Sequence, residues 1–183
     1  LEEYPALLGH RGIEVVGQRE LGNDDPEETG ATFVENAMLK ARHASALSGL
    51  PALADDSGLC VDALDGAPGL YSARFAGPQA GAGDNIALLL ERLAGVPAEA
   101  RSAHFVCVLA WLRHPGDPDP LIASGRWPGR ILEAPRGEGG FGYDPLFLDP
   151  ESGLSAAELS AADKHARSHR GRALRQLVDA LAG

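Results

Sequence analysis

The chain has 183 residues, of which 44% are hydrophobic and 23% are charged, so one globular domain is expected. Its 26 acidic residues outnumber its 16 basic ones, and the formal net charge of −10 argues against a dedicated binder of duplex nucleic acid. No apolar run reaches the ~20 residues of a membrane-spanning helix, and the given residues are not expected to include a signal peptide. Cys60 and Cys107 each lie in an apolar run and are interpreted as reduced core residues of a cytoplasmic protein, with a disulfide as the alternative.

Strands and helices are predicted to be mixed along the chain. Apolar residues at helical spacing, bounded by capping residues or glycine, predict helices at 32–48, 84–93 and 167–181. Short apolar or alternating runs predict strands at 13–16, 50–54, 59–64, 105–112, 121–127, 130–133 and 146–148. This mixture predicts an α/β (α+β) domain around one mixed sheet with helices on both faces.

Two adjacent carboxylates, Asp55 and Asp56, follow the strand predicted at 50–54. Because neighbouring side chains of a strand point to opposite faces, one acid is expected to act and the other to support it. Ser57 adds a hydroxyl group at the same place. The alternative is a solvated turn, since Asp, Ser and Gly are common turn residues.

A loop at 20–28 contains five acidic residues and no basic one. Its ordinary interpretation is a solvated surface. Alternatively, Glu27 and Glu28 could join Asp56 around Mg²⁺, which takes one or two carboxylates, keeps several waters and binds substrate phosphates. The two cysteines have no metal-ligand spacing, so the sequence offers no competing soft-metal site.

Three further segments contain side chains suited to binding a nucleotide. The run from Lys164 to Arg175 has basic residues and no acid, which fits a helix end or a donor cluster facing an anion or a carbonyl-rich ligand. Phe141 follows three glycines in four residues and either stacks on a planar base or anchors its loop as a buried ring. Arg74 either reaches a phosphate or pairs with an acid.

Five motifs occur in order over nearly the whole chain. They are Glu-Thr-Gly-Ala-Thr-Phe-Val-Glu-Asn-Ala at 28–37 with Lys-Ala at 40–41, Ala-Asp-Asp-Ser-Gly-Leu at 54–59, Gly-Ala-Pro-Gly-Leu-Tyr-Ser-Ala-Arg at 66–74, Gly-Gly-Phe-Gly-Tyr-Asp-Pro at 139–145 and Ser-His-Arg-Gly at 168–171. In this order the motifs resemble the inosine triphosphate pyrophosphatase family, most closely the bacterial enzymes that act on dITP, ITP and XTP.

The resemblance implies an ITPase-like fold, in which helices flank a central mixed twisted sheet and the active-site cleft lies between two lobes. It implies Mg²⁺-dependent hydrolysis of dITP, ITP, XTP or dXTP to nucleoside monophosphate and pyrophosphate, which cleanses the nucleotide pool. It also implies a homodimer without nucleic-acid or membrane partners. The family opens with a strand and a phosphate-binding loop, so residues 1–183 are expected to be a single domain that lacks both.

The resemblance also implies roles for the residues that match the family's motifs. Asp56 would be the general base and a metal ligand, and Glu27 or Glu28 would help to hold Mg²⁺. Substrate contacts would come from Ser57, Phe141, Gly142, Tyr143, Asp144, Lys164, His169 and Arg170. Phe141 would stack on the base, and supporting roles would fall to Asp55, Lys40 and Arg74.

The basic side chains expected at the purine predict base selection. Lys and Arg only donate hydrogen bonds, so they match the 6-oxo group of hypoxanthine and xanthine and oppose the 6-amino group of adenine. Two other functions remain as alternatives: a non-catalytic purine nucleotide-binding or sensor module, and an acidic scaffold for divalent cations. The acids at Asp55 and Asp56 count against a sensor, because a binder of triphosphate gains little from added negative charge.

Overall fold

The computed structural model describes residues 9, 14–22 and 24–182, and these group into two compact units. The first unit comprises Leu1–Asp56, Cys107–Gly125 and Arg172–Gly183, and the second comprises Ser57–Val106 and Arg126–Gly171. Among the described residues, no helix has the length and apolarity needed to cross a bilayer.

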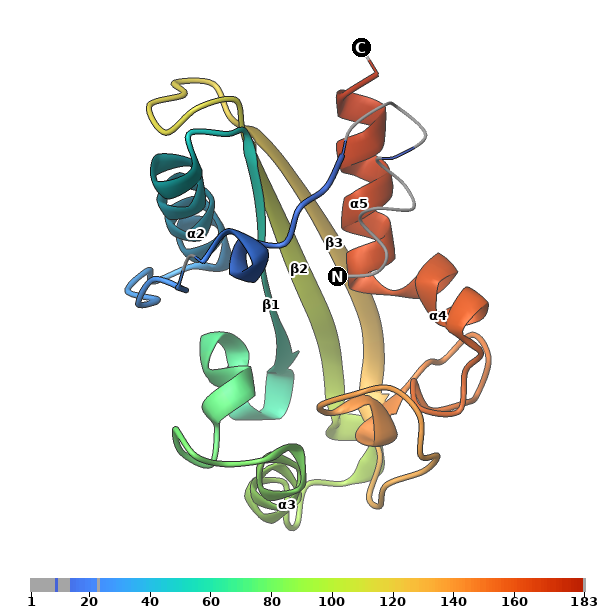
Figure 1. Cartoon of the computed structure of the whole chain (residues 1–183). Helices are drawn as coiled ribbons and strands as arrows, with labels where there is room; N and C mark the ends of the chain where they lie inside the picture. The colour runs from blue at the N-terminus through green and yellow to red at the C-terminus, as the bar shows by residue number, and fades with distance from the viewer. Residues whose placement is uncertain (1–8, 10–13, 23, 183) are drawn as a thin grey trace. The chain divides into compact units, whose positions relative to one another are not determined.

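The described strands form one four-stranded sheet in the order β1-β2-β3-β4, and helices accompany it (Figure 1). The strands are β1 (Ala52–Val61), β2 (Ser102–Leu112), β3 (Leu121–Ile131) and β4 (Phe147–Leu148), and the helices are α2 (Phe33–Ser48), α3 (Ala82–Arg92), α4 (Ala161–Arg167) and α5 (His169–Ala180). The predicted α/β class is confirmed. The sheet is antiparallel rather than mixed, and residues 113–120 between β2 and β3 are too few for the crossover that parallel strands need.

Helix α2 of the first unit begins and ends where the sequence predicts. The Thr32 hydroxyl accepts a hydrogen bond from the Glu35 backbone N–H at 3.2 Å, and Gly49 ends the helix with a φ of 69°. Figure 1 shows α2 running alongside β1. The core of this unit is a separate apolar cluster, whose buried members are Cys107, Leu109, Ala123, Ala173, Leu174 and Leu177.

The second unit has an aromatic core. The ring of Phe147 lies 4.5 Å from that of Phe105 and 5.0 Å from that of Trp127, measured between centroids. Leu89 and Leu93 of the predicted helical stripe are fully buried in the same cluster. That helix, α3, starts slightly before the predicted 84, because Asp84 lies in its first turn and accepts from the Gly81 N–H.

Two predicted breaks in strands are wrong. The strands predicted at 50–54 and 59–64 are one continuous strand, β1, so Asp55 and Asp56 lie inside it rather than in a turn. The strands predicted at 121–127 and 130–133 are likewise one strand, β3, although it contains a Pro-Gly pair. A Cβ atom at Gly129 would lie 2.5 Å from the Leu148 carbonyl oxygen, so glycine here permits close approach of β4. Cys60 and Cys107 form no disulfide, as predicted.

The predicted start of the helix at 167–181 is also wrong. The chain forms two helices in this region, and they meet at Ser168. This residue is extended, with φ −63° and ψ 155°, and its hydroxyl accepts from the Gly171 N–H at 3.1 Å. A Cβ atom at Gly171 would lie 1.9 Å from the His165 carbonyl oxygen, which requires glycine there. Residues 14–16 form no strand, and Ile13, the first residue of the strand predicted there, lies outside the described residues.

Candidate functional site

Asp56 lies at the centre of a polar cluster in the first unit. Asp56 is 7% exposed, and its two carboxylate oxygens have different donors. Lys40 Nζ lies 2.9 Å from Oδ1, and Asn36 Nδ2 donates to Oδ2 at 3.2 Å. Lys40 Nζ also lies 2.7 Å from Glu28 Oε1 and donates to the Asp55 backbone carbonyl at 3.0 Å. We call Glu28, Asn36, Lys40 and Asp56 the carboxylate cluster.

The sequence of α2 explains why two of these residues face β1 together. Asn36 and Lys40 are four positions apart, so they lie on one face of the helix. Asn36 belongs to the buried face with Ala37 and Ala41, whereas the longer Lys40 is only partly buried at its edge. The helix thus presents one amide and one ammonium group to the acid on β1.

Burial and pairing act in opposite directions on the charges of this cluster. Burial raises the pKa of Asp56, and the hydrogen bonds from Lys40 and Asn36 offset only part of that rise. Burial also disfavours the Lys40 ammonium, but its hydrogen bonds to Glu28 and Asp56 outweigh burial and raise the pKa of Lys40. Lys40 therefore remains a cation between two carboxylates at neutral pH.

The carboxylate cluster suits a hard divalent cation. Glu28 and Asp56 reach the same ammonium nitrogen, so one small cation could contact both, and Mg²⁺ takes one or two carboxylates while keeping waters. Glu27 is exposed, so the structure places Glu28, rather than Glu27, beside Lys40. Within the described residues no three His, Cys, Asp or Glu side chains gather as a ready metal site. Water and phosphate oxygens would have to complete the coordination.

A second cluster, in the second unit, surrounds an exposed ring. Phe141 is 64% exposed, with Lys164 Nζ 4.7 Å and Arg170 Cζ 5.8 Å from its ring centroid. Gly140 and Gly142 on either side have φ of 74° and 59°, a backbone that favours glycine. We call Phe141, Lys164 and Arg170 the aromatic–cation cluster. The loop presents a flat apolar face beside two cations, which is suited to a planar ligand with acceptor groups.

Asp144 stabilises the aromatic–cation cluster by contacting two of its members. It is buried, and its Oδ2 lies 2.5 Å from Lys164 Nζ and accepts from the Phe141 backbone N–H at 2.7 Å. A Cβ atom at Gly140 would lie 2.1 Å from the same oxygen, so glycine is required there. Asp144 thus fixes the backbone that carries the Phe141 ring. It also fixes Lys164, which lies over that ring.

Two other residues predicted to contact substrate are buried in the aromatic core. Tyr143 donates its hydroxyl to the Ser72 carbonyl at 2.9 Å, and burial raises the pKa of Tyr143. The His169 ring stacks on Phe105 with centroids 4.8 Å apart and planes 15° apart. Both side chains support the loop and helix that carry the aromatic–cation cluster, and their predicted contacts with substrate stay predictions.

The remaining predicted residues lie outside both clusters. Ser57 and Asp55 are half-buried in β1, and the Asp55 carbonyl, not its carboxylate, has a hydrogen bond from Lys40. Arg74 Cζ lies 5.2 Å from the centroid of the exposed Tyr71 ring. Sequence reasoning missed Asn36 as a functional candidate. The available signal was a polar residue at a buried helical position one turn before Lys40.

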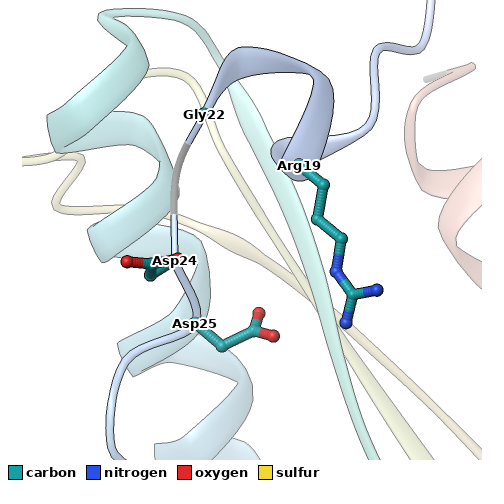
Figure 2. Close-up of a pocket in the computed structure, with 4 residues that line it drawn as sticks. All are labelled: Arg19, Gly22, Asp24 and Asp25. Carbon is teal, nitrogen blue, oxygen red and sulfur yellow. The ribbon is translucent and has the colours of Figure 1, made fainter.

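A hollow of about 300 Å³ in the first unit is lined by Arg19, Gly22, Asp24 and Asp25 (Figure 2). Gln18 Nε2 donates to Asp25 Oδ1 at 2.8 Å beside it. None of the predicted site residues lines this hollow.

Comparison with known proteins places the chain in a family. The model of the Ham1 family matches residues 1–180. The dITP/XTP pyrophosphatase of Xanthomonas oryzae is 62% identical, covering 99% of this chain and 91% of that protein, and the dITP/XTP pyrophosphatase of Escherichia coli O157:H7 is 56% identical, covering 99% and 92%. The structure of a HAM1 protein from Coxiella burnetii superposes with a TM-score of 0.94 at 49% identity, covering 99% of this chain and 92% of that one. The chain therefore belongs to the Ham1 family, which confirms the resemblance seen in its five motifs.

Proposed function

We propose that the protein hydrolyses dITP, ITP, XTP and dXTP to the nucleoside monophosphate and pyrophosphate. Relatives that are 56–62% identical are named dITP/XTP pyrophosphatases. The observation that carries the proposal is the buried Asp56 carboxylate, held by Lys40 and Asn36 beside a second acid, Glu28. Such a group can accept a proton from water, and together with Glu28 it would hold a cation for the phosphates.

In the proposed reaction, Asp56 orients a water molecule and takes its proton as the water oxygen bonds to the α-phosphorus. The bond from that phosphorus to the bridging oxygen breaks, and pyrophosphate leaves with the bonding electron pair. General-base assistance of this kind contributes ~10²–10⁴-fold. Glu28 and Asp56 would hold Mg²⁺, which when bound offsets the charge that develops on the leaving pyrophosphate.

The aromatic–cation cluster would select the base. The exposed Phe141 ring offers a stacking surface, which is worth ~1–3 kcal/mol per base. Lys164 and Arg170 would donate to the 6-oxo group of hypoxanthine or xanthine. Lys164 has three N–H donors and Asp144 takes one, so donors remain for a ligand. Adenine would leave these donors unpaired, and sites of this kind reject a mismatch by ~10⁴–10⁵.

Pyrophosphate release with a panel of nucleotides tests the proposal. Turnover is expected with dITP and XTP in the presence of Mg²⁺, with a far lower kcat/KM for dATP and dGTP. A protein that binds dITP without releasing pyrophosphate would be a sensor, and one that binds Mg²⁺ without any effect of dITP would be a cation scaffold. Equal kcat/KM values for dITP and dATP would contradict selection by the 6-oxo group. Guanine shares that group, so the low value expected for dGTP requires that its 2-amino group is refused elsewhere in the pocket, and equal values for dITP and dGTP would contradict that refusal.

We extend the proposal to a homodimer in the cytoplasm, as the family resemblance implies. Light scattering is expected to give twice the chain mass of 19.1 kDa. A mass of one chain at the concentration of the assay would contradict the dimer. Fractionation of cells into cytoplasmic and membrane fractions tests the location.

A further inference from the structure

Asn36 uses both ends of its side-chain amide inside the carboxylate cluster. It is 1% exposed, its Oδ1 accepts from the Gly30 backbone N–H at 2.8 Å, and its Nδ2 donates to Asp56 Oδ2 at 3.2 Å. Because the Gly30 N–H can only donate, the amide oxygen must face it, and the amide nitrogen must then face Asp56. The orientation of the amide is therefore fixed by its partners.

We propose that Asn36 is a positioning residue for the hydrolysis, which sets the rotation of the Asp56 carboxylate and aligns it with the loop that carries Glu28. This inference rests on the proposed function. The terminal torsion of an Asp side chain is broad, so one hydrogen bond alone leaves the carboxylate able to turn. Lys40 holds Oδ1 and Asn36 holds Oδ2, and the two bonds together leave one orientation.

The second half of the proposal concerns the loop before α2. Gly30 lies two residues after Glu28, and its N–H is held by the same amide that holds Asp56. A Cβ atom at Gly30 would lie 2.6 Å from Asn36 Oδ1, so only glycine allows the backbone to come this close. One buried side chain therefore sets the position of both acids that would bind the cation.

A purely structural role is the competing explanation, and a second asparagine in the chain allows a matched test. Asn85 is 5% exposed, its Oδ1 accepts from the Ala76 N–H at 2.8 Å, and its Nδ2 donates to the Ala73 carbonyl at 3.2 Å. The pattern equals that of Asn36 except that the acceptor is a backbone carbonyl instead of Asp56. Changing either residue to Asp keeps the shape and the first bond but replaces the donor by an acceptor.

The experiment compares Asn36→Asp, Asn85→Asp and the unchanged protein by steady-state kinetics with dITP and Mg²⁺ and by thermal unfolding. Both variants are expected to lose thermal stability. Only Asn36→Asp should lose kcat, by ~10–100-fold as for other residues that orient a metal ligand, with KM changed less than about threefold. Asn85→Asp should keep kcat within about twofold.

Three results would overturn the proposal: an Asn36→Asp protein with normal kcat, a loss that falls on KM alone, or equal loss of kcat in both variants. Where Asn36→Asp does not fold, Asn36→Ser takes its place under the same criteria. The shorter serine side chain reaches neither the Gly30 N–H nor Asp56. Turnover by the unchanged protein is measured first. Its absence for every deaminated nucleotide would refute the proposed function, and the inference with it, whereas normal turnover isolates the role of Asn36.

Discussion

Each cluster contains a buried acid, but the two acids have different proposed roles. In the carboxylate cluster, Lys40 and Asn36 hold the buried Asp56 by its two oxygens, and the acid itself is the proposed reactive group. In the aromatic–cation cluster, the buried Asp144 holds Lys164 and the backbone of Phe141, and the groups available to a ligand are the ring and the cations. Under the proposed function, the carboxylate cluster carries out the reaction, and the aromatic–cation cluster recognises the base.

Two buried acids, one in each unit, show how partners decide a pKa. For Asp56 burial prevails and raises the pKa. Burial also opposes the charge of Asp149, but hydrogen bonds from Ser152 and Trp127, with the charge of Arg167, lower its pKa. Asp149 therefore stabilises the fold as a carboxylate, whereas folding disfavours the charged form of Asp56.

The chain has two lysines, and one lies in each cluster. Replacing each lysine in turn therefore tests the contrast between the clusters, and these replacements are expected to have the largest effects. Lys40→Met leaves Glu28 and Asp56 without their shared cation, so kcat should fall by at least ~100-fold, as when one electrostatic donor is removed from an active site. Lys164→Met removes the proposed contact with the base, so its main effect should be a higher KM for dITP. Steady-state kinetics on both variants checks the split, and a loss confined to KM in Lys40→Met would remove the distinction between the clusters.

A smaller effect is expected from Phe141→Ala. Loss of a stacking contact worth ~1–3 kcal/mol should raise KM for dITP by roughly 5- to 150-fold with kcat little changed. The melting temperature should barely move, because the ring is 64% exposed. Kinetics and a thermal melt on the same preparation provide the test. An unchanged KM would show that Phe141 is not the stacking surface.

The smallest effect is the dependence of stability on pH that Asp149 contributes. Its pKa is lowered in the folded protein, so its stabilisation is complete above the ordinary Asp value of about 3.9 and is lost as the pH falls through the folded value. Asp149→Asn should therefore lose less stability than the unchanged protein when the pH is lowered from 5 towards 3. Melting temperatures across this range measure the difference, and parallel curves for the two proteins would exclude this contribution.

Local patterns in the sequence predicted the regular elements well, and packing explains the failures. Helix α2 and strand β2 follow capping and apolar patterns that need no distant partner. Strand β1 passes through Asp-Asp-Ser-Gly, which favours a turn, because partners from α2 satisfy the buried carboxylate there. The break at Ser168 was hidden because Ser-His-Arg-Gly was interpreted as binding chemistry rather than as the cap of a second helix.

The site was predictable in its residue types and less so in its contacts. The motifs placed Asp56, Lys40, Phe141 and Lys164 among the candidates, and the structure brings them into the two clusters. Glu28, rather than Glu27, lies beside Lys40 because of the path of the loop before α2. The spacing of residues in the sequence does not encode that path. The role of Asn36 depends on a partner twenty residues away, and the polar residue at a buried helical position does not by itself identify that partner in the sequence.

The central claim is that Asp56 is the general base, and turnover of dITP by Asp56→Asn tests it most directly. The amide keeps the size of the side chain but accepts no proton, so kcat should fall by ~10²–10⁴-fold while the protein stays folded and still binds dITP. A folded Asp56→Asn protein that releases pyrophosphate from dITP at the rate of the unchanged protein would contradict the account.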